Sequence, residues 1–340
     1  MRLDLDYSLN PNLCDFDVLL VDSVGTSFNS FSIANGGLGG SEQQAILLLE
    51  GLSAAGYSVG CINRGPHASR SLNGVRYFPV NDIERGTVAP RCKTLISMRS
   101  GFMPNGIEFD NVVFWLHDIP DQNLQNISTY LRDMDDSRIV TVSDWQKSKL
   151  PPGWDTRATT IYNQIPDWIY DVKSEQRKNF TYASAALKGL DATLAAWNQL
   201  KKKSYFFKEE SLNVLSPGYD KPSGDIAKNK GVVWVGPQPL TRVVEHISAS
   251  RALFYVNGGI PETFGLVPLM AEVLGTPTLI FCPGESGALS ELMAMKPCTT
   301  SEEFLDRCEA KSYLASSGAH DNLRSSNIIP QWEKYLGLKQ

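Results

Sequence analysis

The sequence has few cysteines, and none stands in a CxxC pair. Six are scattered over 340 residues, from Cys14 to Cys308. Thiols spaced in this way argue against a zinc site and against a disulfide framework. We therefore expect reduced thiols of the kind found in the cytosol, and no bound metal ion.

Long apolar runs are missing as well. No stretch of 18 residues is both apolar and uncharged, so we expect no segment that spans a membrane. The first ten residues, MRLDLDYSLN, lack the apolar centre of a signal peptide. These absences predict a cytoplasmic protein, and they leave room for peripheral contact with a membrane surface.

The sequence also has no excess of positive charge. The 32 Lys and Arg residues are outnumbered by 37 Asp and Glu residues, which gives a net charge of −5. This balance argues against a nonspecific nucleic-acid binder, and we expect no nucleic-acid partner. The length is sufficient for two domains, whereas nothing in the composition indicates an oligomeric state.

Short apolar runs alternate with helical segments along the chain. The predicted strands cover residues 17–22, 58–62, 94–98, 112–116, 139–142, 159–162, 179–183, 212–215, 232–235, 252–256 and 278–281. The predicted helices cover residues 42–55, 143–150, 188–200, 239–250, 265–275, 284–293, 301–316 and 320–336. This alternation is typical of doubly wound parallel sheets, and so predicts an α/β fold.

The stretch from 255 to 277, YVNGGIPETFGLVPLMAEVLGTP, joins a strand to a helix through a glycine loop. Glu262 lies in this loop, and the helix is expected to begin at Gly265. In open α/β sheets, ligands bind at the carboxyl ends of the strands, and helix N-termini favour anions. The stretch therefore predicts a site for an anionic ligand.

A second glycine loop precedes the first long helix. Four of the five residues from 36 to 40 are glycine, and Ser41 is a good N-cap for the helix that follows. The spacing from the first strand does not match a dinucleotide fingerprint. The loop is either a flexible turn or a segment whose backbone approaches a ligand closely. We favour the second interpretation, because a turn needs fewer glycines.

Three charged or polar positions follow predicted strands. Arg99 follows one strand, and His117 and Asp118 follow the next. His117 is either a packed structural residue or a ligand contact that stabilises charge in a cleft. Lys188 stands between a strand and a helix, where it is either a solvated surface lysine or a phosphate contact.

Five motifs then match one family in order and over most of the chain. They are GGLGGSEQ, WLHD, IVTVSDWQKSKL followed by IYNQIPD, YASAALKGLD, and PETFGLVPLMAEVLGTP. Together they resemble the retaining glycosyltransferases of the GT-B fold, of the family-four type that uses nucleotide sugars.

The resemblance implies two Rossmann-like doubly wound domains that face a central cleft. Residues 1–165 would form an N-terminal acceptor domain, joined by a C-terminal helix at 321–340. Residues 166–320 would form the nucleotide-sugar donor domain. The implied reaction transfers a sugar, without a metal ion or cofactor, from a UDP or GDP type of donor to a saccharide or glycolipid. In the family, the leaving phosphate helps to deprotonate the acceptor.

The resemblance also implies roles for individual residues. His117, Glu262 and Lys188 would be catalytic, with Glu262 on the sugar hydroxyls and Lys188 on the diphosphate. The donor-binding residues would be Gly39, Gly40, Ser184, Thr263, Phe264, Gly265 and Leu266. The further candidates are Arg99, Asp118, Asn163, Met270 and Glu272.

Two positions depart from the family pattern. The residues before Lys188 lack the usual arginine, unless Arg99 or Arg242 takes its place. Met270 stands eight residues after Glu262, where the family usually has the glutamate that holds the ribose. Glu272 is turned about 200° away on a helix and cannot simply replace it. Two alternatives therefore stay open: a catalytically degenerate GT-B scaffold with a binding or regulatory role, and a nucleotide-sugar epimerase.

Overall fold

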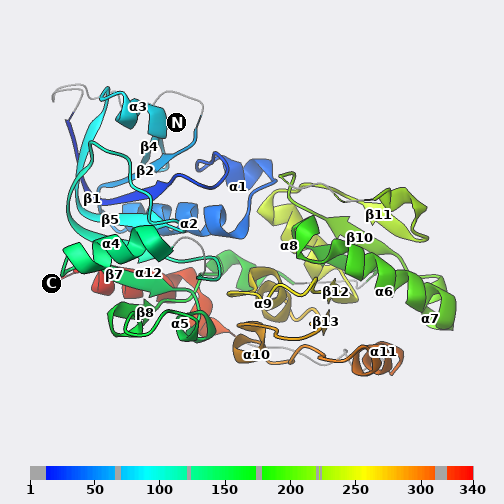
Figure 1. The fold of residues 1–340 in the computed structure, drawn as a ribbon. Helices are drawn as coiled ribbons and strands as arrows, with labels where there is room; N and C mark the ends of the chain where they lie inside the picture. The colour runs from blue at the N-terminus through cyan, green and yellow to red at the C-terminus, as the bar shows by residue number, and fades with distance from the viewer. Residues whose placement is uncertain are drawn as a thin grey trace.

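The computed structural model describes residues 13–65, 70–120, 124–173, 178–219, 222, 224–310 and 320–339. Two α/β units lie side by side, and both chain ends lie on the first unit (Figure 1). No helix within these ranges is long and apolar enough to cross a membrane. Five cysteines of the described side chains are buried free thiols.

The first unit is built on an eight-stranded sheet in the order β3-β4-β2-β1-β5-β6-β7-β8. Its strands are β1 (Leu13–Asp22), β2 (Val59–Asn63), β3 (Arg70–Leu72), β4 (Val75–Pro79), β5 (Ala89–Met98), β6 (Glu108–Trp115), β7 (Arg138–Thr141) and β8 (Ala158–Thr160). All neighbours are parallel except the edge pair β3–β4. All the predicted strands of this half are present, and the apolar cores of β1, β2, β5, β6 and β7 are buried inside the parallel sheet. The strand predicted at 159–162 is shorter, because β8 ends at Thr160 and is an edge strand with one buried residue.

The edge hairpin was not among the predicted elements. Asn73 and Gly74 both have positive φ angles, of 49° and 78°. This Asn-Gly pair forms the tight turn between β3 and β4, which is a strong hairpin signal. Arg76 interrupts the apolar run of β4, so hydrophobicity alone does not indicate a strand there.

The helices of the first unit connect its parallel strands. They are α1 (Ser32–Asn35), α2 (Gly40–Ala54), α3 (Val80–Glu84), α4 (Leu124–Asp133) and α5 (Asp144–Ser148). The prediction that Ser41 is the N-cap of α2 is wrong. Gly39 is the N-cap, with extended backbone angles, and the helix begins at Gly40. The carboxylate of Glu42 lies where a side chain at position 39 would be, and no side chain caps this helix by a hydrogen bond.

The second unit has a five-stranded parallel sheet in the order β11-β10-β9-β12-β13. Its strands are β9 (Phe180–Ala183), β10 (Leu212–Leu215), β11 (Val232–Trp234), β12 (Ala252–Val256) and β13 (Thr278–Phe281). Its helices are α6 (Leu190–Lys203), α7 (Tyr205–Lys208), α8 (Leu240–Ser248), α9 (Leu266–Val273), α10 (Leu289–Leu292) and α11 (Ser301–Glu309).

Two predicted helices of this half are shorter than expected. Of the range 284–293, only Leu289–Leu292 is helical. Gly287 explains the late start, because it has a φ of 67° and pairs with the backbone of Glu262. Of the range 301–316, Ser301–Glu309 is helical, and residues 311–316 lie outside the described ranges.

The chain crosses between the two units twice, and the crossings lie side by side. The amide of Ile165 donates to the carbonyl of Leu323 at 2.7 Å, and the amide of Ser325 donates to the carbonyl of Ile165 at 3.1 Å. The second crossing leads into α12 (Ser325–Tyr335), which lies against α2. Gly51 allows α2 and α12 to approach each other closely, because a Cβ at this position would meet the side chain of Ile329 at 2.5 Å.

Trp332 anchors α12 to the first sheet. Its ring is 1% exposed and lies edge-on to Trp115, with the ring centroids 5.0 Å apart. We expect Trp332→Ala to lower the free energy of unfolding by about 3–5 kcal/mol, since it removes a large buried side chain. Urea denaturation followed by circular dichroism would measure the loss. Trp168→Ala is the matched control, because Trp168 is 41% exposed, and an equal loss in both variants would contradict the anchoring role.

Candidate functional site

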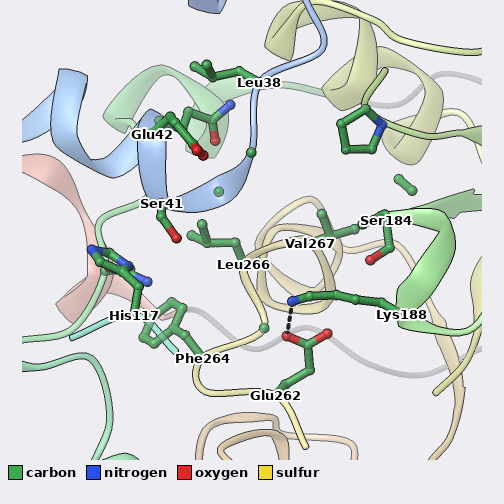
Figure 2. A pocket seen from close by; sticks show the side chains of 18 of the residues that line it. Leu38, Ser41, Glu42, His117, Ser184, Lys188, Glu262, Phe264, Leu266 and Val267 are labelled. Carbon is green, nitrogen blue, oxygen red and sulfur yellow. Dashed lines mark hydrogen bonds and ion pairs between the residues drawn. The ribbon is translucent and has the colours of Figure 1, made fainter. Parts of the chain in front are cut away.

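A cavity of about 490 Å³ lies between the two units and is lined by residues of both. This volume is in the range of small-molecule sites. The structure brings nearly all the predicted site residues to its wall: Gly39, Gly40, Arg99, His117, Asp118, Asn163, Ser184, Lys188, Glu262, Thr263, Phe264, Gly265, Leu266 and Met270. Side chains of α2 face Lys188 and Glu262 across the space (Figure 2).

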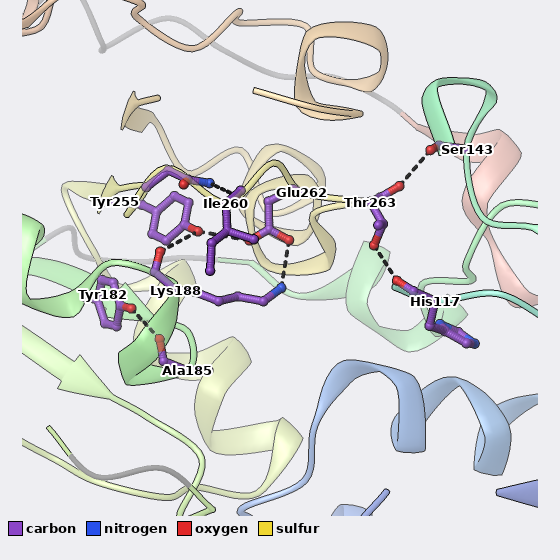
Figure 3. Close-up of polar contacts among 10 residues, drawn as sticks. His117, Ser143, Tyr182, Ala185, Lys188, Tyr255, Ile260, Glu262 and Thr263 are labelled. Atoms are coloured by element: carbon purple, nitrogen blue, oxygen red, sulfur yellow. Dashed lines mark hydrogen bonds and ion pairs between the residues drawn. The ribbon is translucent and has the colours of Figure 1, made fainter. Parts of the chain in front are cut away.

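Lys188 and Glu262 form an ion pair in the cavity. The Nζ atom of Lys188 lies 2.8 Å from Oε2 of Glu262, and the hydroxyl of Tyr255 donates to Oε1 at 2.9 Å (Figure 3). Burial lowers the pKa of Lys188, but the facing carboxylate outweighs it, and the net pKa is raised. Burial and the charge of Glu262 raise the pKa of Tyr255. Glu262 is therefore held as a fixed acceptor beside a protonated amine.

The N-terminus of α9 lies beside this pair. Gly265 is its N-cap in the left-handed conformation, with a φ of 86°. A Cβ at Gly265 would come within 2.2 Å of Leu289, so only glycine fits. The first amides of a helix have no partner within it and carry partial positive charge. An anionic group near Lys188 would thus find both an ammonium group and free N–H donors.

Thr263 forms hydrogen bonds between the two units at the cavity. Its hydroxyl donates to the carbonyl of His117 at 2.6 Å, and its own carbonyl accepts from the hydroxyl of Ser143 at 2.7 Å (Figure 3). Next to it, the rings of Phe264 and Tyr162 lie 6.2 Å apart. These contacts set the distance between Glu262 and the strand ends of the first unit.

His117 is 5% exposed at the end of β6, and its ring centroid lies 4.4 Å from that of Trp115. Burial, together with the charge of Arg99, holds its pKa well below the ordinary value, so the imidazole is neutral. Its Nε2 has no hydrogen-bond partner within the described residues, and neither has Oδ1 of Asn163. Both residues line the cavity, although these two atoms are themselves buried.

Arg99 stands in a buried ion cluster of the first unit. Its Nη2 atom lies 2.6 Å from Oε1 of Glu42 and 3.4 Å from Oδ2 of Asp22. Burial lowers the pKa of Arg99, but the two carboxylates outweigh it and raise the net pKa. The main chain at Gly25 covers the cluster, and a Cβ there would meet Oδ2 of Asp22 at 2.4 Å. Two carboxylates thus offset the charge of Arg99, which still lines the cavity.

The missing arginine has no substitute in the described structure. Arg242, the other alternative, is an exposed residue of α8 that pairs with Glu245 and is not part of the lining. The Asp, Glu, Lys and Arg residues of the lining are Glu42, Asp118, Glu262, Arg99 and Lys188. Two positive and three negative groups leave one surplus negative charge, so an anion depends on Lys188 and the helix N-terminus.

Glu272 does not reach the cavity. It is fully buried, and its carboxylate binds Nε2 of His320 at 2.6 Å and the amides of Ala294 and Met295 at 3.0 and 2.9 Å. Burial raises its pKa, but these bonds outweigh burial and lower it. The rotation of about 200° along α9 explains the difference, since Met270 faces the cavity and Glu272 faces away from it.

Two residues of the site were given no role by the sequence. Glu42 is an acidic residue in the first turn of α2, and Tyr255 is the one hydroxyl-bearing residue of the buried strand β12. Both features are visible in the sequence, but their contacts are not. Glu42 pairs with Arg99, 57 residues away, and Tyr255 bonds to Glu262, 7 residues away. Among the described residues, no group of three or more His, Cys, Asp or Glu side chains is placed to hold a metal ion.

No family model matches this sequence, and no curated protein matches it. Solved structures do match over nearly the whole chain. Sucrose-phosphate synthase from Thermosynechococcus elongatus matches with a TM-score of 0.65 and 13% identity, over 96% of this chain and 98% of that one. The lipopolysaccharide outer core galactosyltransferase WaaB has a TM-score of 0.59 and 13% identity, over 95% and 99% of the two chains.

A third match is WaaG, a glycosyltransferase of lipopolysaccharide biosynthesis, with a TM-score of 0.52 and 14% identity, over 94% of this chain and 90% of that one. At this identity the likeness concerns the fold. The chain has the GT-B fold, in which two Rossmann-like domains face a central cleft, and this confirms the predicted fold class.

Proposed function

We propose that this protein is a glycosyltransferase that moves a sugar from a nucleoside diphosphate to a saccharide or glycolipid acceptor, with retention at the anomeric carbon. Residues 166–320 would bind the donor, and residues 1–165 with the C-terminal helix would bind the acceptor. The observation that carries the proposal is the meeting of Glu262, Lys188, His117 and the α9 N-terminus in one cavity between the domains. The GT-B fold and the glycosyltransferases that share it support the same reaction class.

Lys188, Glu262 and His117 each have a task in this reaction. Lys188 and the amides at Gly265 and Leu266 neutralise the diphosphate as it leaves, so this charge needs no metal ion. Glu262 accepts hydrogen bonds from sugar hydroxyls, and the neutral His117 lies beside the anomeric centre. The bond from the anomeric carbon to phosphate breaks, a bond to the acceptor oxygen forms, and the acceptor proton passes to the leaving diphosphate.

Calorimetry with UDP, GDP, ADP and their sugar conjugates, followed by an assay of donor hydrolysis, tests the proposal. We expect one nucleotide class to bind and to release its sugar slowly, with both activities lost in Glu262→Ala. The absence of binding by every nucleotide would refute the proposal.

A second candidate is a GT-B scaffold that binds a nucleotide without turnover. Met270 and the surplus negative charge of the lining favour it, because both weaken the hold on a nucleoside diphosphate. Binding without sugar release or transfer would support this candidate. An epimerase would instead convert the sugar of the donor, which NMR of the product would show.

A further inference from the structure

The carboxylate of Glu262 has two side-chain partners within the described residues, Lys188 and Tyr255. The two partners differ in how firmly they are held. The side chain of Lys188 is 40% exposed, whereas Tyr255 is 4% exposed. The ring of Tyr255 also packs against that of Tyr182, with the ring centroids 5.9 Å apart. The amine can therefore turn to another partner, whereas the hydroxyl of Tyr255 stays in place.

The hydroxyl of Tyr255 lies near two acceptors. Oε1 of Glu262 is 2.9 Å away, and the main-chain carbonyl of Lys188 is 3.2 Å away (Figure 3). The carbonyl already accepts from the amide of Gly258 at 3.1 Å. Because the carboxylate is the closer acceptor and carries charge, the hydroxyl donates its single proton to Glu262. Burial and the charge of Glu262 raise the pKa of Tyr255, so the hydroxyl remains a donor.

The main chain of Glu262 is held separately. It forms a parallel bridge with Gly287, and its carbonyl accepts from the amide of Ala288 at 2.8 Å. A Cβ on Gly287 would lie 2.2 Å from this carbonyl oxygen, so the two segments are in close contact. These contacts place the side chain of Glu262 at the cavity, but they do not orient its carboxylate. The orientation depends on Lys188 and Tyr255.

The function proposed above changes one of these two contacts. The diphosphate of the donor attracts the amine of Lys188, which turns away from Glu262. Oε2 then becomes available to a sugar hydroxyl, while Oε1 stays bonded to Tyr255. Without the hydroxyl of Tyr255, the carboxylate would be free to rotate at this point, and its ordering would cost conformational entropy when the sugar binds.

We propose that Tyr255 is a positioning residue for the transfer reaction, which holds the carboxylate of Glu262 towards the sugar while Lys188 turns to the diphosphate. This inference rests on the proposed function and adds a residue to it. Tyr255 acts through Glu262, so its effect should fall on the reaction of the sugar and not on the binding of the diphosphate.

Tyr255→Phe tests this role, because it keeps the packed ring and removes only the hydroxyl. We expect the rate of sugar release or transfer to fall by roughly 3- to 10-fold, the scale of one intramolecular hydrogen bond. The Kd for the nucleoside diphosphate alone should change by less than about twofold, because the lost interaction serves the sugar. Calorimetry with UDP, GDP or ADP, whichever binds the unaltered protein, and an assay of sugar release from its conjugates would measure the two effects.

Tyr182→Phe is the matched control. It removes another buried hydroxyl from the neighbouring strand β9, one that donates to the carbonyl of Ala185 at 2.7 Å and is not bonded to Glu262 (Figure 3). We expect this variant to retain the rate of the unaltered protein. Equal losses of rate in both variants would overturn the inference, because they would show a general effect of packing.

The other outcomes separate this inference from the proposed function. An unchanged rate in Tyr255→Phe, or equal losses of rate and of diphosphate affinity, would overturn the inference and leave the function standing. A lack of binding by all three nucleotides would overturn both.

A crystal structure of the unaltered protein with the nucleotide that binds tests the inference without a variant. We expect the amine of Lys188 to lie on the diphosphate, with the hydroxyl of Tyr255 still bonded to Oε1 of Glu262. A complex in which this hydroxyl bond is broken would overturn the inference, even where Tyr255→Phe fails to fold.

Discussion

Replacement of Glu262 by glutamine should separate nucleotide binding from reaction of the sugar. We expect the rate of sugar release or transfer to fall by roughly 10- to 150-fold, because the sugar loses a hydrogen bond to a charged acceptor. The affinity for the nucleoside diphosphate alone should stay the same or increase. The reason is the ion pair at 2.8 Å, since removal of the Glu262 charge leaves Lys188 free for phosphate.

Calorimetry with the diphosphate and a coupled assay of diphosphate release would measure the two effects. Glu302→Gln is the control, because Glu302 is an exposed residue of α11 and not part of the cavity lining. Equal losses of diphosphate affinity and of turnover in Glu262→Gln would contradict the assigned role. That result would mean that the carboxylate only maintains the structure of the loop.

Removal of the amine of Lys188 should have the second large effect. We expect Lys188→Ala to weaken diphosphate binding by roughly 1.5–3 kcal/mol, the scale of a hydrogen bond to a charged group. We expect no other side chain to compensate for the lost affinity. Glu42 and Asp22 offset the charge of Arg99, and no other Lys or Arg of the described residues lines the cavity. Titration of the nucleotides that bind the unaltered protein would measure it.

Lys202→Ala is the matched control for this change, since Lys202 is an exposed residue of the helix that follows Lys188. Lys188→Arg should keep most of the affinity, because the positive charge is retained. An unchanged affinity in Lys188→Ala would show that Lys188 pairs with Glu262 but does not contact the phosphate.

The elements of this fold could be predicted where the signal is local. Strand β12 is a short apolar run that is buried throughout, and the apolar run of β1 at residues 18–21 is buried as well. The hairpin of β3 and β4 has a turn signal at Asn73-Gly74, but polar residues interrupt the apolar pattern of both strands. The Ser41 prediction failed because the backbone is already helical from Gly40, and Gly39 has the extended conformation of an N-cap.

The candidate site could also be predicted only in part, where the signal is local. The strand ends at Arg99 and His117 and the loop at Glu262 could be placed in one cleft, because the carboxyl ends of parallel strands lie along the same edge of a sheet. The charge state of that cleft could not be predicted. It depends on pairs such as Arg99 with Glu42, whose members are far apart in the chain and meet only when the sheet forms.

The sequence by itself determined the α/β class, the order of the motifs and the position of Met270 eight residues after Glu262, because these follow from local periodicity and spacing. Only the tertiary structure decided that Lys188 is paired with Glu262, that Arg99 is paired with Glu42, and that Met270 lines the cavity while Glu272 turns away to His320. Spacing sets which face of an element a residue occupies. What that face meets depends on elements brought together from distant parts of the chain.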